Sequence, residues 1–498
     1  MEVKLTLRRP GIDAADEAIV YLDRDSAACR DMGLIPPDRL RVSCHGRAVT
    51  ARLNLVSGSL LDPDEAALSE AAWKSLGAQD GDMASIRKDE AIDSMSQVRA
   101  KIFGHRLGDD PMRGILGDII SGRYSDIQLA AFVTACAARP LDTDEIAALT
   151  TAMVDTGVRM NWPQVIVGDK HCVGGLPGNR TTPIIVAIAA ACGVTIPKTS
   201  SRAITSPAGT ADMIEVLAPV DLSLDRLRRV VEDEGGCIAW GGAVDLSPAD
   251  DILIRIERAL DLDSHGQLIA SVLSKKIAAG ATHVVIDMPV GPSAKVRSAQ
   301  EAAVLSRTFI AVARRFGLHL RIVTTNGAQP VGRGIGPALE ARDVLAVLRN
   351  ARDAPSDLRL RALMLAGALL ELTGKAAEGA GEALAERTLA SGKAWSKFQA
   401  ICAAQGGMRT PPAARFRHAV AAPLPGRVEA MDNRLLARAA QCAGAPEEKA
   451  AGLDLHVRIG DPVEEGQPLF TLHAQNKGDL AHALGFLQGH EPVITLRH

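Results

Sequence analysis

The chain has 498 residues, and at about 150 residues per domain this length predicts about three domains. Hydrophobic residues make up 47% of the sequence and charged residues 23%, which excludes a largely disordered chain. The 56 lysines and arginines nearly balance the 59 aspartates and glutamates, so the net charge of −3 favours neither a nucleic acid nor a membrane surface as partner.

Targeting and metal-binding signals are missing from the sequence. The longest apolar run, residues 183–197, is shorter than the ~20 residues of a membrane span and predicts a buried helix. The N-terminus shows no secretory signal, so we expect a cytoplasmic protein. The eight cysteines form no CxxC pair, and HxxxH and HExxH motifs are missing, so we expect neither a disulfide framework nor a metal site.

The first half of the chain predicts two small domains. Residues 1–88 contain alternating segments at 39–43 and 47–55, typical of a β-rich N-terminal domain. Residues 92–160 carry apolar residues at helical spacing behind the capping residues Ser125 and Asp142, so they predict a helical subdomain that is completed by about residues 250–280.

The second half predicts a large α/β domain over residues 161–410 and a C-terminal α+β domain over residues 421–498. Strands are expected at 165–167, 284–288 and 320–324, each followed by a turn and a helical stretch, which indicates a parallel or mixed sheet. A further helix is expected at 383–404, and strands of the last domain at 455–459 and 469–472. The predicted fold class is therefore α/β, with a helical subdomain and a large mixed α/β domain forming a cleft.

Two polar motifs stand out in the predicted α/β domain. Residues 168–182 (GDKHCVGGLPGNRTT) place a glycine-rich turn and Lys170 between a strand and a helix, a combination that binds oxyanions. A simple tight turn with a solvated lysine is the alternative. Residues 198–212 (KTSSRAITSPAGTAD) gather six hydroxyls, a lysine and an arginine, which suit anions and sugar hydroxyls, although such residues are also common in turns.

These motifs, together with residues 271–276 (SVLSKK) and 326–339 (NGAQPVGRGIGPAL), resemble the thymidine and pyrimidine-nucleoside phosphorylases. The resemblance extends over nearly the whole chain. It is closest to the branch with an extra N-terminal domain, which holds type 2 thymidine phosphorylases and AMP phosphorylases. It implies a pentosyltransferase that splits thymidine with phosphate into thymine and 2-deoxyribose 1-phosphate. The alternative substrate is a nucleoside 5′-monophosphate such as AMP, which would give ribose 1,5-bisphosphate.

The resemblance also implies roles for individual residues. Asp263 is expected as proton donor, with His171 and Lys275 as further catalytic residues. The phosphate and substrate ligands implied are Lys170, Gly175, Thr182, Ser200, Ser201, Arg202, Ala203, Ile204, Thr205, Ser206, Thr210, Ser271 and Lys295. No cofactor or metal is implied, because inorganic phosphate is the co-substrate. Relatives in this family are oligomers, so we expect a homodimer or larger homo-oligomer.

Two departures from the family pattern concern the site. Cys172 stands where thymidine phosphorylases usually have serine, which weakens or removes a hydroxyl contact to phosphate. The arginine expected ahead of Ser271 has no ungapped match, since Ile256 falls there and Arg255 is one residue away. Arg180, Arg202 and Lys295 are cations that suit a 5′-phosphate. Asp263 is alternatively a helix cap, and two other readings, a phosphoribosyltransferase and a nucleotide-sensing protein, stay open.

Overall fold

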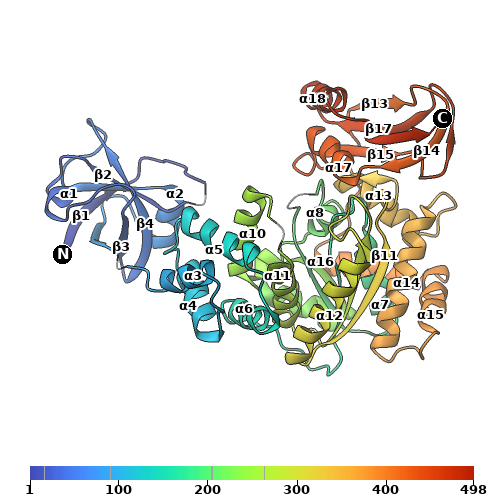
Figure 1. Ribbon diagram of the computed structural model, residues 1–498, viewed down its shortest axis with the longest axis horizontal. Coiled ribbons are helices and arrows are strands. Elements are labelled where there is room, and N and C mark those ends of the chain that lie inside the picture. Colours follow the sequence, from blue (N-terminus) through green and yellow to red (C-terminus); the bar gives the residue numbers. More distant parts are fainter. Residues whose placement is uncertain (16, 90, 204–205, 263, 498) are drawn as a thin grey trace. The chain divides into compact units, whose positions relative to one another are not determined.

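The computed structural model describes residues 1–15, 17–89, 91–203, 206–262 and 264–497. The chain divides into two compact units (Figure 1). The first comprises Met1–Leu141 with Arg255–Leu262, and the second comprises Asp142–Ile254 with Asp263–His498. None of the described helices is both long and apolar enough to cross a membrane.

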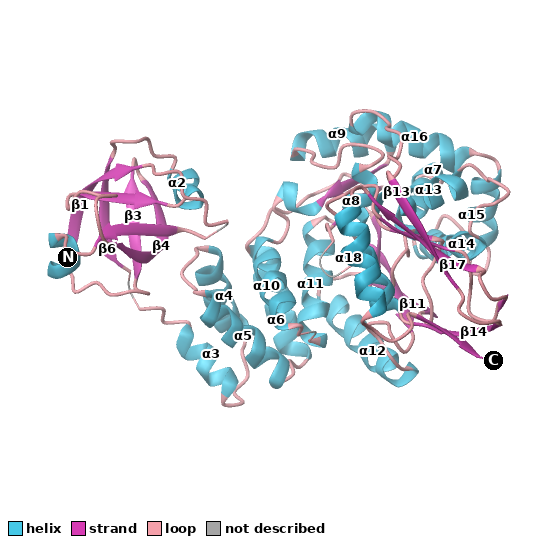
Figure 2. Ribbon diagram, turned by 90° about the horizontal axis from the view of Figure 1, so that it is seen from above, coloured by secondary structure: helices cyan, strands magenta, loops and turns pink. Residues whose placement is uncertain are grey.

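The first unit begins with a closed six-stranded barrel (Figure 2). Its strands follow the order β1-β5-β2-β4-β3-β6, and antiparallel pairing of β1 with β6 closes the barrel. Alternation explains the barrel, because every second residue of a strand, such as Leu40 and Val42, is buried inside. The strands are β1 Glu2–Arg8, β2 Ile19–Asp23, β3 Arg39–Cys44, β4 Arg47–Val56, β5 Glu65–Leu68 and β6 Met83–Lys88.

Short helices complete the first unit. Ser125 accepts a hydrogen bond from the backbone N–H of Gln128 and caps the last of them, which confirms the capping prediction. These helices are α1 Ala27–Asp31, α2 Glu70–Leu76, α3 Met95–Ile102, α4 Asp109–Ile120 and α5 Asp126–Ala138, and α10 Pro248–Leu260 spans the division between the two units.

The second unit is built on parallel strands. β10 pairs in parallel with β11 and β7, β8 pairs in parallel with β9, and a parallel bridge between Val167 and Thr195 joins the two sheets. Helices α12 and α14 both pack against β10, whose central residues are fully buried. The strands are β7 Gly168–Cys172, β8 Ile196–Ser200, β9 Gly236–Trp240, β10 His283–Val290 and β11 His319–Asn326.

The helices of the second unit enclose one large apolar core around α7 and α14. Asp142 caps α6 through the backbone N–H groups of Asp144 and Glu145, as the sequence predicts. The helices are α6 Thr143–Asp155, α7 Thr181–Ala191, α8 Thr210–Glu215, α9 Leu224–Glu234, α11 His265–Ala278, α12 Ala299–Arg315, α13 Pro337–Leu348, α14 Ser356–Leu372, α15 Gly381–Ala390, α16 Lys393–Gln405, and a 3₁₀ turn at Gly241–Val244.

Two short sheets form the C-terminal part. One has the order β12-β15-β17-β13 and the other β16-β14-β18. Strand β12 comes from the segment after β11, so the C-terminal sheet includes two residues that lie about a hundred positions earlier in the chain. The elements are β12 Gly334–Ile335, β13 Phe416–Ala421, β14 Gly426–Met431, α17 Asn433–Cys442, β15 Gly452–Leu455, β16 Pro462–Val463, β17 Pro468–Ala474, α18 Lys477–Gln488 and β18 Ile494–Arg497.

Four local predictions were wrong. The strand expected at 165–167 begins only at Gly168, where pairing with β10 starts. The buried helix expected over 183–197 ends at Ala191, because Gly193 adopts φ +78° and the chain then enters β8. The helix expected at 383–404 is broken at Ser391 and Gly392, and the strand expected at 455–459 ends at its first residue.

Candidate active site

The predicted motifs follow the carboxyl ends of parallel strands. The first glycine-rich loop follows β7, the hydroxyl-rich motif follows β8, and the segments with Lys295 and with residues 327–336 follow β10 and β11. The carboxyl ends of parallel strands lie at one edge of a sheet, where α/β proteins bind their ligands. The topology therefore brings the separate motifs to one edge.

Gly175 shows why the first loop needs glycine. Its φ is +77°, and a Cβ atom there would lie 2.5 Å from the backbone nitrogen of Lys295. A side chain is excluded both by the left-handed backbone and by the lack of space. The loop after β7 therefore packs directly on the loop after β10, and two predicted ligand residues become neighbours.

Lys170 is fully buried and lies among polar partners. Its ammonium donates to Thr181 Oγ1 at 2.9 Å and to Thr182 Oγ1 at 3.5 Å, and lies 3.8 Å from Asp287 Oδ2. Asp287 also accepts hydrogen bonds from Asn179 at 2.9 Å and from Thr325 at 2.7 Å. A buried ammonium is tolerated because these oxygens replace water. The lysine is thus held next to the loop that is expected to bind phosphate.

Asp169 binds two more buried lysines. Its Oδ2 lies 2.8 Å from Lys276 Nζ, and its Oδ1 lies 3.5 Å from Lys198 Nζ. The same Oδ1 accepts the backbone N–H of Lys170 at 2.6 Å. The side chains of Asp169, Lys198 and Lys276 are each at most 5% exposed. One carboxylate therefore fixes lysines from β8 and α11 and the backbone of β7.

His171 and Cys172 are both uncharged near neutral pH. Burial, reinforced by Lys276 and Lys198, lowers the pKa of His171 well below its usual value, so its imidazole is neutral. Burial, together with Asp287, raises the pKa of Cys172 to about 12, so its thiol stays protonated. Asn179 donates a hydrogen bond to the Cys172 sulfur at 3.3 Å. This sulfur stands in place of the serine hydroxyl that the family pattern has at this position.

The hydroxyl-rich motif after β8 contains one unsatisfied buried oxygen. Ser200 Oγ is buried and has no hydrogen-bond partner within the described part of the chain. A bound ligand could supply the partner that this buried hydroxyl needs. Ser201 is exposed, Ser206 donates to the Ala208 carbonyl at 2.8 Å, and Thr210 begins α8. Three predicted residues, Ile204, Thr205 and Asp263, lie outside the described residues.

Arg202 and Arg180, expected as cations for a 5′-phosphate, both bind carboxylates of the protein. Arg202 donates to both oxygens of Glu215 at 2.8 and 2.9 Å and lies over the Trp240 ring at 4.7 Å. The hydrogen bond from Arg202 lowers the pKa of Glu215 to about 2. Arg180 donates to Glu340 of α13 and to the carbonyl of Ala208, so it connects the loop after β7 to a helix and to the loop before α8.

Asp212 organises the loop between β8 and α8 through backbone hydrogen bonds. Its Oδ2 accepts the backbone N–H of Ala203 at 2.6 Å and of Gly209 at 2.9 Å. The N–H of Ala203, predicted to line the ligand site, is therefore already bound. Lys449 of the C-terminal part lies 3.6 Å from Asp212 and 3.0 Å from Glu215, so this loop is anchored from both sides.

Helix α11 presents the residues expected to contact the base. Ser271 and Lys275 lie one turn apart, and Lys275 Nζ is 3.5 Å from Ser271 Oγ and 2.5 Å from Asp250 of α10. The helix is capped by Ser264, whose Oγ accepts the N–H of Gln267. The alternative role of Asp263 as the helix cap concerns a residue outside the described part of the chain. Arg255, the nearest arginine to the position the family pattern requires, is exposed and pairs with Asp126 at 3.1 Å.

Several site residues were missed from the sequence. Lys276 stands beside the predicted Lys275, and Thr181 stands beside Thr182. Asp287 lies inside the apolar strand β10, where a charge is unusual. A charged residue inside an apolar strand is the signal from which this polar site could have been found. Lys198 is part of the predicted hydroxyl-rich motif, but the sequence assigns it no role of its own. The residues missed are Asp169, Asn179, Thr181, Asp212, Asp250, Lys276 and Asp287.

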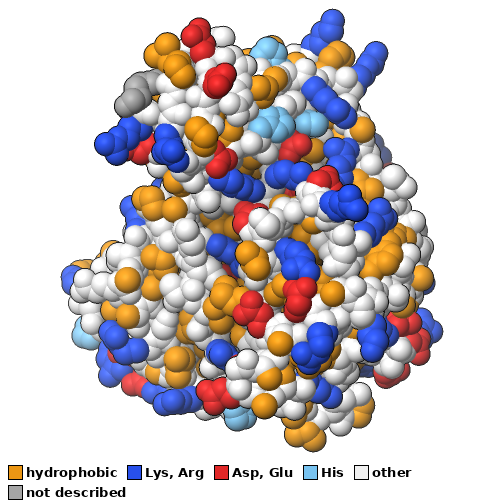
Figure 3. Space-filling model, turned by 90° about the vertical axis from the view of Figure 1, so that its right-hand side faces the viewer, with side chains coloured by type: hydrophobic (Ala, Val, Ile, Leu, Met, Phe, Trp, Pro, Cys, Tyr) orange, Lys and Arg blue, Asp and Glu red, His pale blue; other side chains and the backbone are white. Residues whose placement is uncertain are grey.

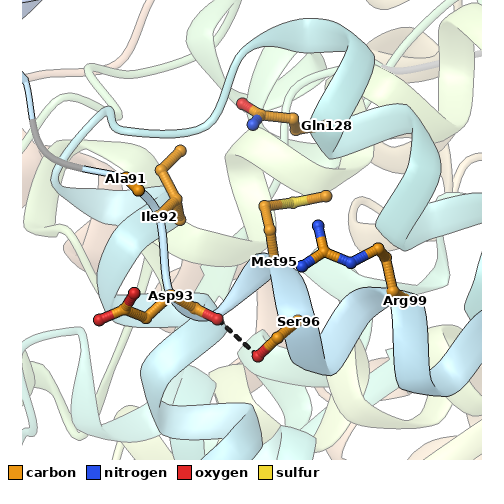
Figure 4. Close-up of a pocket in the computed structure, with 7 residues that line it drawn as sticks. All are labelled: Ala91, Ile92, Asp93, Met95, Ser96, Arg99 and Gln128. Carbon is orange, nitrogen blue, oxygen red and sulfur yellow. Dashed lines mark hydrogen bonds between the residues drawn. The ribbon is translucent and has the colours of Figure 1, made fainter.

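Other features of the surface lie apart from the predicted residues. A pocket of about 440 Å³ in the first unit is lined by the start of α3 and by Gln128, and Ser96 donates there to the Asp93 carbonyl (Figure 4). It contains no predicted site residue. Among described residues, Cys44, His45 and Asp82 place metal-type ligand atoms within 4.8 Å, although His45 and Asp82 are already hydrogen-bonded at 2.8 Å. The face in Figure 3 mixes basic and acidic side chains.

Comparisons with known proteins agree with this arrangement. Three protein-family models match: "Glycosyl transferase family, helical bundle domain" at residues 96–157, "Glycosyl transferase family, a/b domain" at 164–395, and "Pyrimidine nucleoside phosphorylase C-terminal domain" at 427–489. A solved structure, anthranilate phosphoribosyltransferase from Thermus thermophilus, matches with a TM-score of 0.51 and 22% identity over 62% of this chain and 98% of its own. At that identity the likeness shows the fold alone.

Full-length relatives are much more similar. A protein of Polaromonas sp. named "Putative thymidine phosphorylase" is 60% identical over 97% of this chain and 94% of its own. A relative of the same name from Tolumonas auensis is 55% identical over the whole of both chains. With these relatives and the matching domains, the chain belongs to the pyrimidine nucleoside phosphorylase family and is an enzyme of the pentosyltransferase class.

Proposed function

We propose that the protein catalyses phosphorolysis of a pyrimidine nucleoside, converting thymidine and phosphate into thymine and 2-deoxyribose 1-phosphate. The observation that carries the proposal is the buried lysine cluster beside the glycine-rich loop, in a chain whose full-length relatives carry thymidine phosphorylase in their names. Lysines and loop N–H groups at the end of parallel strands bind an oxyanion.

Phosphate is the nucleophile of this reaction. Lys170 and the loop that contains Gly175 and Thr182 would hold it next to C1′ of the sugar, which turns a bimolecular attack into a positioned one. A phosphate oxygen forms the new bond to C1′ as the bond from C1′ to the base nitrogen breaks. Ser200, Ser201, Ser206 and Thr210 are the proposed partners of phosphate and sugar oxygens. Ser200 is the clearest of them, because its oxygen has no hydrogen-bond partner among the described residues.

The departing base takes the electron pair of the broken bond. Lys275, fixed by Asp250 and Ser271, is the cation that would offset this charge, and the neutral imidazole of His171 would donate a hydrogen bond. Asp263 stays the proposed proton donor and Lys295 a proposed ligand. No cofactor is required in this scheme, because phosphate itself forms the new bond.

The proposal also covers substrate choice, assembly and compartment. Arg180 and Arg202 already bind Glu340 and Glu215, so no observation favours a 5′-monophosphate over a nucleoside. We expect a homodimer or larger homo-oligomer, because the family that the chain resembles consists of oligomers. The cytoplasm is the proposed compartment.

The test is phosphate-dependent release of free base from thymidine, uridine, cytidine, adenosine, AMP, CMP and UMP, followed by chromatography with and without phosphate. The expected result is release from pyrimidine nucleosides only when phosphate is present. Release confined to the monophosphates would transfer the enzyme to the nucleotide phosphorylases. No release from any compound by the folded protein would overturn the proposal.

A further inference from the structure

Lys198 is a buried lysine for which the proposed reaction has no role. It lies in the middle of β8, is 4% exposed, and its ammonium is 3.5 Å from Asp169 Oδ1. Its ammonium also donates to the carbonyl of Thr199. Burial of a lysine is costly, so its presence beside a ligand loop needs a physical reason.

The charges around Lys198 do not balance. The buried cations are Lys170, Lys198 and Lys276, and the buried carboxylates that face them are Asp169 and Asp287. The other titratable groups beside Lys198 are His171 of β7 and Cys237 of β9, which burial keeps neutral, and Lys275 of α11, whose charge is balanced by Asp250. With all three buried lysines protonated, this part of the described structure carries one positive charge in excess.

The excess charge lies beside the expected ligand. Side chains two positions apart point to the same side of a strand, so Lys198 shares one side of β8 with Ser200, whose Oγ lacks a partner within the described structure. Asp169, which Lys198 contacts, precedes Lys170 and His171 in the chain. An anion bound at the glycine-rich loop would therefore complete the charge balance of the cluster.

We propose that Lys198 is a positioning residue that couples phosphate binding to proton uptake: its amine is protonated when a divalent anion occupies the loop, and it then shares Asp169 with Lys276. This inference rests on the proposed function, since phosphate is taken as the ligand. The only chemical step is transfer of one proton from solvent to Lys198 Nζ, so no oxidant or other reactant is needed.

The electrostatics around Lys198 support this coupling. Burial lowers the pKa of Lys198 to about 7, although Asp169 opposes the shift and Lys276 adds to it. A nearby dianion would raise this pKa, because it favours the protonated amine. Anion binding should therefore be strong below pH 7 and weaken as the pH rises above it.

The test uses sulfate, which stays divalent from pH 6 to 9, whereas phosphate itself titrates in that range. Calorimetry of the whole protein in two buffers of different ionisation enthalpy measures how many protons each sulfate takes up. We expect uptake of more than half a proton at pH 8, and an affinity that falls about tenfold for each pH unit above 7. Sulfate binding without proton uptake would overturn the inference. This measurement uses the wild-type protein alone.

The variant Lys198→Met identifies the group that binds the proton. Methionine has a similar length and leaves Lys170 and Lys276 against Asp169 and Asp287, so the cluster stays balanced and the protein should fold. We expect no proton uptake and less than a threefold change in sulfate affinity between pH 7 and 9. At pH 6.5 the KM for phosphate should rise about tenfold, while kcat changes less than threefold.

Matched controls separate this inference from the proposed function. Lys449→Met removes an ammonium from the Arg202 loop and should leave proton uptake unchanged. If Lys198→Met keeps the wild-type pH profile, the inference is wrong while the proposed phosphorolysis stands. If neither sulfate nor phosphate binds to the wild-type protein at any pH, the proposed function itself fails.

Discussion

Two charged clusters of the second unit are built in opposite ways. The first joins Lys170, Lys198 and Lys276 to Asp169 and Asp287, and all of these side chains are buried. The second joins Arg202 and Lys449 to Asp212, Glu215 and Asp221, and most of these side chains are a quarter or more exposed. The buried cluster has more cations than anions, and the exposed one has the reverse.

The difference separates ligand binding from loop positioning. A buried excess of positive charge is costly and is relieved by an anionic ligand, so it indicates a binding site. Partly exposed ion pairs are screened by water, so each contributes little to the free energy of unfolding. In the exposed cluster the cations and carboxylates pair with one another without a ligand. Substitutions in the two clusters should therefore differ strongly in their effect on phosphate binding. Their effects on the free energy of unfolding should differ only weakly.

The largest effect is expected for Lys170→Met. This change removes the ammonium next to the phosphate loop, and kcat/KM for phosphate should fall about a thousandfold. Steady-state kinetics measure the loss, and circular dichroism checks the fold. Lys449→Met, which removes the same charge from the exposed cluster, should change kcat/KM by less than threefold. Equal losses in both variants would erase the distinction between the clusters.

Gly175→Ala should cost about a hundredfold in kcat/KM for phosphate, because its Cβ would meet the backbone of Lys295 and displace the loop. Gly193→Ala is a matched control, since Gly193 has φ +78° but its nearest neighbour would be the end of the Lys375 side chain at 3.6 Å. Similar kinetics for the two variants would show that backbone strain, and not the contact with Lys295, sets the effect.

Glu340→Gln should flatten the pH dependence of stability. Burial raises the pKa of Glu340 from 4.5 to about 7, so its stabilising contribution is full below about pH 4.5 and is lost as the pH rises through 7. The wild-type free energy of unfolding should drop by roughly 3 kcal/mol more than that of the variant between pH 4.5 and 8. Thermal unfolding at several pH values measures this, and parallel curves would contradict the assignment.

Glu215→Gln tests the exposed cluster. Loss of the paired carboxylate should loosen the segment that Arg202 and Asp212 anchor, and the KM for the nucleoside should rise about threefold to tenfold. Added salt should shrink the difference, because the cluster is partly exposed to solvent. A rise in the KM for phosphate of equal size would place this loop in the phosphate site instead.

The smallest effect is expected for Arg255→Ala. Arg255 and Asp126 are more than half exposed, so their ion pair should contribute less than about 0.5 kcal/mol, and kcat/KM should change less than twofold. A tenfold loss for the nucleoside would show instead that Arg255 replaces the arginine that the family pattern requires ahead of Ser271.

Much of the fold was predictable from local patterns. Alternation located β3 and β4, and capping residues located the starts of α5 and α6, because these signals act within a few residues. The start of β7 was misplaced by three residues. Residues 165–167 are apolar enough for a strand, but the pairing partner β10 begins opposite Gly168, which no local pattern reveals.

The site was predictable where a motif holds the residue and not where packing does. Lys170 and Ser200 stand in polar motifs, whereas Lys276 and Asp287 come from distant segments that tertiary pairing brings to Asp169 and Lys170. Arg180 and Arg202 were expected as spare cations because their partners, Glu340 and Glu215, are distant in sequence or lack a motif. A sequence shows which charges exist and does not show which ones neutralise each other.

Strand β12 makes the C-terminal sheet depend on a segment far upstream. Gly334 and Ile335 pair with Asp454 and Leu453, and Ile335 is buried in the C-terminal core. A protease cut between Gln405 and Phe416 would therefore yield two fragments that stay associated under native conditions, and truncation after residue 410 would expose Ile335 and leave its backbone unpaired. The C-terminal sheet therefore includes residues from two distant segments of the chain. A C-terminal domain exchanged between relatives would have to include Gly334 and Ile335 as well.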